Sequence, residues 1–250
     1  LTFNNQLSSS ISYTKNFNNK ANLSLAITHS QNNNTHLVNI SLPNMSFNVN
    51  TIYPLQKKEK VGASKWYESL GIGYQVSFQN TVGFYDTNFS FKRMIDTFQW
   101  GASHNIPISL TLPALGPFVI SPFVSYAENW HGQQVLLSWD TSRYKVDTTV
   151  HKGFYTERQM SFGVSASTRI FGTVKFKNSN IVAIRHEIRP QISFSYHPDL
   201  VSQNFYTTKI DTSNGGHYYR FSKFGSNYPG YFGEGNSGSI GFTLDLSLIH

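Results

Sequence analysis

The sequence predicts an all-β protein, specifically an antiparallel transmembrane β-barrel of the outer-membrane type. From Met160 to Phe176, apolar and polar side chains alternate with a period of two. Successive side chains of a strand point to opposite faces, so this segment has one apolar and one polar face. Soluble strands usually have about 5–6 residues, whereas a tilted strand that crosses a membrane needs roughly 9–11. Length and pattern together favour a membrane barrel.

The composition fits the same class. Charged residues make up 13% of the chain and aromatic residues 15%, yet the mean hydropathy is −0.32. No apolar run approaches the roughly 18 residues that a membrane helix needs. A barrel reconciles low charge with low hydropathy, because half of each spanning strand faces a polar lumen.

Cysteine content and charge narrow the functional classes. The chain has no cysteine, which excludes a disulfide scaffold, zinc fingers and thiol catalysis within it. The formal charge of +7 is dispersed rather than gathered in a patch. We therefore expect no nucleic-acid partner, and a lumen that meets anionic lipid or sugar instead.

The N-terminal half shows three strands and their turns. Strands are expected near 10–13, at 22–27 and at 38–49, with polar turns at 18–19 and 31–34. Within the third strand the parity of the apolar residues changes across Pro43. This change predicts a bulge or a break at the proline.

The remaining strands follow at similar spacing. They are expected at 70–78, 106–112, 119–130, 152–176 and 181–197, with a last one from Ser239 onward. Pro107 predicts a local defect in the ladder, because proline has no N–H to donate. In all, about nine to eleven strands are expected, with boundaries uncertain by roughly 2–4 residues.

Connection lengths predict an orientation. The turns at 115–117 and 177–180 are short, and the connections at 81–97, 131–150 and 198–236 are long and fall in the alternate places. Outer-membrane barrels have short periplasmic turns and long extracellular loops. The last connection holds an aromatic cluster, interpreted as a loop over the barrel mouth or an interfacial girdle, with sugar stacking as the alternative: Tyr218, Tyr219, Phe221, Phe224, Tyr228, Tyr231 and Phe232.

Charged residues gather on the polar parity of the last strands. The candidate contacts to lipid or sugar are Arg169, Lys175, Arg185, Glu187, Arg189 and Asp245. Charges are costly on a lipid-facing surface, so these side chains are expected in the lumen. Two interpretations stay open: a cross-strand salt-bridge ladder that braces the wall, or a basic track for lipid phosphates.

Catalytic signatures are missing from the sequence. No nucleophile elbow occurs, the nine histidines show no metal-binding pair, and the glycines between 230 and 238 form no phosphate loop. We expect no catalytic residue, no metal and no cofactor, and hence no enzyme.

Parts of the chain match the sequence motifs of a known family: 165–173 (SASTRIFGT), 183–186 (AIRH), Pro190 and 194–199 (FSYHPD), with weaker matches at 39–43, 52–54, 65–68 and 237–240. Through these residues the chain resembles the LptD family of lipopolysaccharide-assembly proteins, most closely its Bacteroidota form. The resemblance implies a structural role for a set of motif residues: His186, Pro190, Tyr196, Pro198 and Asp199. Arg189 departs from the pattern, since relatives tend to have a small polar residue before the proline.

The resemblance also implies a function and partners. Residues 1–250 would be one part of a barrel domain in the Gram-negative outer membrane, and the barrel would insert lipopolysaccharide into the outer leaflet. An LptE-like plug lipoprotein and the periplasmic Lpt bridge components would be its partners. The first residue, Leu1, and the strand pattern that runs to His250 suggest an internal fragment, without the family's periplasmic jellyroll and closing strands.

Two other classes compete with this interpretation. A diffusion porin or a TonB-dependent importer barrel would also have long loops and a basic lumen. A lipid-modifying enzyme embedded in a barrel is the third class, with no sequence motif in its favour.

Overall fold

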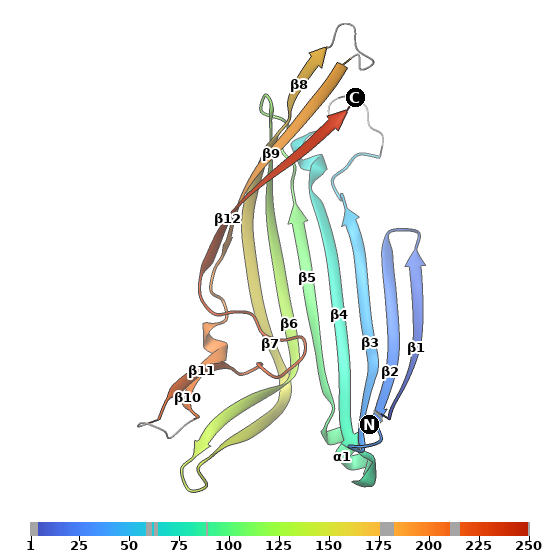
Figure 1. Ribbon diagram of the computed structural model, residues 1–250, viewed down its shortest axis with the longest axis vertical. Helices are drawn as coiled ribbons and strands as arrows, with labels where there is room; N and C mark the ends of the chain where they lie inside the picture. Colours follow the sequence, from blue (N-terminus) through green and yellow to red (C-terminus); the bar gives the residue numbers. More distant parts are fainter. Residues whose placement is uncertain are drawn as a thin grey trace.

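The computed structural model describes residues 5–58, 62, 65–88, 90–175, 183–210 and 216–249. A ten-stranded antiparallel sheet dominates these residues, and its strands lie side by side along the long axis of the molecule (Figure 1). Its strands are β1 (Gln6–Phe17), β2 (Ala21–Asn32), β3 (Leu37–Ile52), β4 (Gly71–Tyr85), β5 (Gln99–Ser109), β6 (Phe118–Asp140), β7 (Lys145–Thr168), β8 (Ile170–Lys175), β9 (Ala183–His197) and β12 (Ser237–Ile249). The all-β antiparallel prediction is confirmed. The sheet is open, with β1 and β12 at its two edges, so a closed barrel stays a prediction.

A second, smaller sheet lies within the last long connection. It is a hairpin of β10 (Phe205–Lys209) and β11 (Tyr218–Ser222). The described helical structure is limited to α1 (Phe91–Asp96) and to single 3-10 turns at Trp66–Ser69, Asp86–Asn88 and Ser202–Asn204. No helix in the described ranges is long and apolar enough to cross a membrane.

Strand register keeps polar and apolar residues on separate faces of the large sheet. One line of directly paired residues crosses β1 to β7 and is polar throughout: Thr14, Ser24, Ser46, Ser77, Ser103, Asn129 and Glu157. The adjacent line points the other way: Tyr13, Leu25, Met45, Phe78, Ala102, Trp130 and Thr156. We call these two sides the polar face and the apolar face.

The bulge predicted at Pro43 is confirmed, and it explains how β3 keeps this separation. Register shifts between Ser41 and Asn44 against β4, and at the matching point against β2. Because β3 holds one residue more than either neighbour there, its apolar residues return to the same face on both sides of the proline.

The ladder defect predicted at Pro107 is also confirmed. Pairing between β4 and β5 stops after Ile72↔Ile108 and resumes at Gln75↔Asn105. Gly73 lies opposite the proline, and a Cβ there would come within 3.0 Å of the ring carbon Cγ of Pro107. A glycine at this position therefore gives the proline ring the space that it needs.

The predicted connections are right in part. A tight turn does precede β6, with Gly116 at φ +62°, and residues 198–236 do form a long connection. The long loop predicted at 131–150 is wrong, because β6 and β7 continue through it and turn only between Asp140 and Lys145. The connection between Ile52 and Gly71 is also long, although it lies at the same end as the turn before β6, so loops are sorted by length only in part. The turn predicted at 177–180 lies outside the described residues.

Candidate functional site

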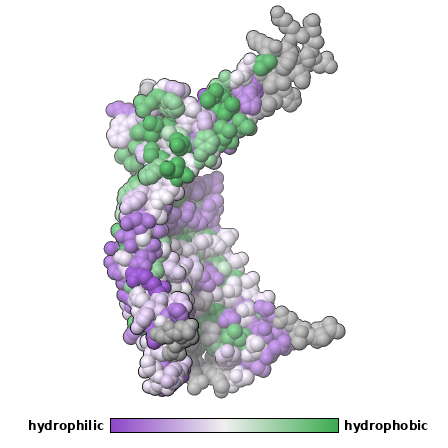
Figure 2. Space-filling model, turned by 60° about the vertical axis from the view of Figure 1, so that its left-hand side comes forward, coloured by the Kyte–Doolittle hydropathy of each residue, from purple (hydrophilic) through white to green (hydrophobic). Residues whose placement is uncertain are grey.

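The last three strands of the sheet present their apolar residues outward. Ile240, Phe242 and Leu246 of β12 are 76%, 70% and 61% exposed, and neighbouring residues of β9 are similarly uncovered. Figure 2 shows hydrophobic residues gathered over the upper part of the molecule, where β8, β9 and β12 lie in Figure 1. Exposed apolar surface of this extent marks an interaction with a partner or a membrane.

The opposite, polar face of these strands brings the predicted charged residues together. Ser167 pairs with Gln191 and Ile170 with Ile188, so Arg169 stands opposite Arg189. Arg189 in turn pairs with Asp245 of β12. One line across the sheet therefore holds two arginines and an aspartate, as their common parity predicts.

Within this group the structure describes one ion pair. Arg189 donates from Nε to Oε1 of Glu187 at 2.7 Å, and Glu187 is 8% exposed whereas the Arg189 side chain is 48% exposed. The two residues lie on one strand, so this pair is not the rung of a cross-strand ladder. It satisfies a nearly buried carboxylate, which would otherwise be costly.

Arg185 has different surroundings. Its guanidinium lies over the ring of Phe171, 4.5 Å from the ring centroid, in a cation–π contact. Among the described residues, neither Arg185 nor Arg169 forms an ion pair. The side chain of Lys175 lies outside what the structure describes. Whether any of these residues contacts lipid stays a prediction.

The motif residues lie along β9 and just past its C-terminal end. Pro190 lies where the strand paired with β9 changes from β7 to β8, and a proline has no N–H to donate to a ladder. His186 pairs with Gly172 and Leu248. Just past β9 and Pro198, the Asp199 carboxylate accepts bonds from the N–H groups of Val201 and Ser202, each at 3.0 Å. Tyr196 and the Asp199 N–H both donate to the Asn236 side chain. These contacts join the two ends of the 198–236 connection.

The main feature that the sequence did not predict is a segment of this connection that folds back across the polar face. We call residues 222–232 the inward segment. Phe224, at 1% exposure, stacks on the ring of His131 with 4.1 Å between centroids. Asn227 exchanges hydrogen bonds with Gln133 at 3.1 and 2.6 Å. Tyr228 donates to Ser77 at 3.1 Å.

Beneath the inward segment lies a buried pair of ionisable groups. His131 Nε2 and Glu157 Oε2 are 3.7 Å apart, and both side chains are fully buried. Phe232 donates its N–H to Glu157 at 3.0 Å, but both His131 nitrogens lack a hydrogen-bond partner. Burial of polar groups without hydrogen-bond partners costs free energy, and such groups in native structures call for a role.

Aromatic residues form a second unpredicted feature on the apolar face. Trp100 lies 6.1 Å from Phe154 and 6.3 Å from Phe78, and Trp130 lies 5.6 Å from Phe154. We call these four residues the aromatic belt. The belt comes from the strands, whereas the aromatic cluster expected to form a loop or a girdle lies in the last connection, where Phe224 packs on the sheet and Tyr218 is exposed.

The described residues hold no group of three or more His, Cys, Asp or Glu that could bind a metal. Their arrangement defines the class of protein: long antiparallel strands that form a curved wall with one apolar and one polar face (Figure 1). The chain belongs to the LptD family, because the family model described as LptD protein matches residues 1–248. A comparison with curated proteins gave no match. The family acts in lipopolysaccharide transport and assembly at the outer membrane, and it is not known for catalysis.

Proposed function

We propose that this chain is part of the wall of an outer-membrane β-barrel that inserts lipopolysaccharide into the outer leaflet. The observation that carries the proposal is the pair of adjacent lines across β1 to β7, one polar throughout and the next almost entirely apolar. A barrel wall needs this separation, because one face meets acyl chains and the other meets water.

The dimensions of β6 support a membrane placement. From Phe118 to Trp130 the strand advances 12 residues, or about 40 Å at roughly 3.3 Å per residue. A tilt of about 40° reduces this height to about 30 Å, close to the thickness of the hydrocarbon core. Trp130 belongs to the aromatic belt, and tryptophan prefers the membrane–water interface. The rest of β6 and β7 would then project beyond the membrane.

In the proposed transport function no covalent bond is made or broken. The sugar portion of lipopolysaccharide would pass along the polar face, where hydroxyl and amide groups replace the hydrogen bonds of water. The acyl chains would stay in apolar surroundings, and the energy would come from other members of the transport chain. An LptE-like plug lipoprotein and the periplasmic bridge components are the partners proposed for the whole protein.

The charged residues near β8 and β9 would divide into two roles. Arg189 would brace the wall by holding the nearly buried Glu187. Arg185 forms no ion pair among the described residues and is exposed beside Phe171. Arginine binds phosphate through two parallel hydrogen bonds, so we propose Arg185 as the contact to lipid phosphates.

The decisive experiment is depletion of the intact protein in cells, followed by quantification of lipopolysaccharide on the cell surface. We expect surface lipopolysaccharide to fall while the amount made inside the cell continues to rise. Unchanged surface exposure would show that the proposal is wrong. Single-channel recording of the purified intact protein is the companion measurement, since a diffusion porin would give a steady open conductance and a plugged, gated barrel would not.

A further inference from the structure

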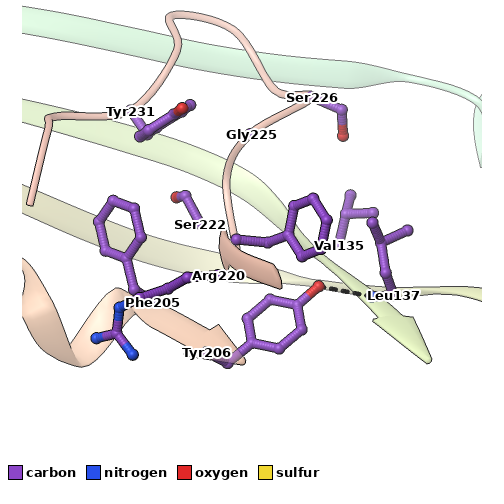
Figure 3. Close-up of a pocket in the computed structure, with 10 residues that line it drawn as sticks. Val135, Leu137, Phe205, Tyr206, Arg220, Ser222, Gly225, Ser226 and Tyr231 are labelled. Carbon is purple, nitrogen blue, oxygen red and sulfur yellow. Dashed lines mark hydrogen bonds between the residues drawn. The ribbon is translucent and has the colours of Figure 1, made fainter. Parts of the chain in front are cut away.

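A cavity of about 310 Å³ lies between the β10–β11 hairpin, the projecting end of β6 and the inward segment. This volume is at the lower end of the range typical of small-molecule sites, roughly 300–1,000 Å³. Figure 3 shows Phe205, Tyr206 and Tyr231 around the cavity, with the side chains of Ser222 and Ser226 also on its border.

Aromatic rings on two elements form the walls. Phe205 and Tyr231 meet edge to face, with 5.7 Å between their centroids. Tyr206 is fixed from the other side, because its hydroxyl oxygen accepts the Leu137 N–H at 2.7 Å. Tyr231 nevertheless stays 49% exposed. Large rings held in place and left open to solvent offer flat apolar faces to a ligand.

The rim of the cavity carries one charged lining residue, Arg220, and this residue is paired with a carboxylate. Arg220 lies near Phe205, 5.9 Å from its ring centroid, and donates two hydrogen bonds to the Glu234 carboxylate, one of them at 2.5 Å. A guanidinium has five N–H donors, so this pair uses two and leaves further donors, while the carboxylate keeps acceptor capacity. The rim can therefore both donate and accept beside an aromatic wall.

This combination selects among ligand classes. A sugar ring has faces of C–H bonds that pack on aromatic rings, and a perimeter of hydroxyl groups that donate and accept. An acyl chain would leave the polar rim without partners, and a free phosphate would have to compete with the Glu234 carboxylate for the arginine. We infer that the cavity binds a neutral saccharide ring of a glycan. The inference rests on the proposed function for the source of that glycan, the sugar portion of lipopolysaccharide.

Direct binding to the intact purified protein tests the inference. The probe is the lipid-free core oligosaccharide released by mild acid from lipopolysaccharide, observed by saturation-transfer-difference NMR. Tyr231→Ala is expected to weaken binding about fivefold or more, as the loss of one aromatic contact predicts. Tyr231→Phe should bind like the unmodified protein, because it keeps the ring.

The matched control is Tyr218→Ala, which removes a tyrosine that is 71% exposed and does not line the cavity. Full binding by this variant, together with loss in Tyr231→Ala, supports the site. No binding of the oligosaccharide by the unmodified protein overturns it, as does equal binding by Tyr231→Ala, or binding of lipid A that the Tyr231→Ala change weakens. Failure of the proposed function would appear separately, as unchanged surface lipopolysaccharide on depletion.

Discussion

Replacing Phe224 by alanine should release the inward segment from the polar face. The Phe224 ring is 1% exposed and lies parallel to the His131 ring, with an interplanar angle of 7°. Truncating a buried phenylalanine costs about 3–5 kcal/mol. The segment is a connection without regular structure, so this loss is expected to appear as local opening rather than global unfolding.

Hydrogen–deuterium exchange of the intact protein in detergent would measure this opening. A loss of about 3–5 kcal/mol corresponds to exchange that is faster by roughly 10² to several times 10³ for amides that the docked segment protects. The N–H groups of Val135 and Phe232 are suitable reporters, since they bond to Lys223 O and to Glu157. Tyr218→Ala, at an exposed position of β11, should leave both unchanged. If both amides in the Phe224→Ala variant kept their protection, the assigned role of this ring in docking would be wrong.

Three further predictions concern the wall and the cavity. Arg189→Leu should lower the yield of folded protein, because it leaves the Glu187 carboxylate without its hydrogen-bonded partner, whereas Arg185→Leu should keep the yield and raise outer-membrane permeability; equal yields would contradict the division of roles. Deleting Pro43 should leave the yield of folded, surface-inserted protein within about twofold, because β3 then alternates without its bulge, whereas deleting Ser24 from the regular strand β2 should abolish insertion. The Arg220 guanidinium holds the pKa of Glu234 below its ordinary value by hydrogen bonding, so the ion pair persists above that ordinary value and is lost as pH falls through the lowered one. Oligosaccharide binding should therefore stay constant from about pH 8 to pH 5 and fall only at a pH below the ordinary glutamate pKa of about 4.3, and a decline already at pH 6 would argue against this assignment.

Alternation predicted most strands where one face of the sheet is apolar, but the single strand expected at 152–176 is wrong, because it is divided at Arg169 into β7 and β8. The break at Pro43 and the ladder defect at Pro107 were predicted for the same reason, since each disturbs a period of two or removes a donor. The far end of the β6–β7 hairpin was missed, because nearly all residues at the start of β7 are exposed on both faces and therefore show no alternation. Thr148, Thr149 and Val150 have suitable strand propensity, which is the signal that could have identified it.

The inward segment could not be predicted from the sequence. Its contacts join residues about a hundred positions apart, such as Asn129 and Gly230, and no local pattern specifies them. The aromatic cluster could be recognised in the sequence, but the sequence does not show which of its residues are buried and which line a cavity. Phe224 is buried against the sheet, whereas Tyr231 lines an open cavity.

One charged pair on the apolar face helps to place the inward segment relative to the proposed membrane. Glu128 accepts hydrogen bonds from Tyr126 and from Trp130 Nε1, and it lies 3.3 Å from Arg158 Nε across the strand pair. A charge pair is costly within the hydrocarbon core but not at the interface, where tryptophan also prefers to lie. Asn129 and His131, at the same level of β6, carry the inward segment on the opposite face. On the proposed placement, therefore, the inward segment crosses the lumen at the membrane boundary, next to the cavity and where a glycan would leave the barrel.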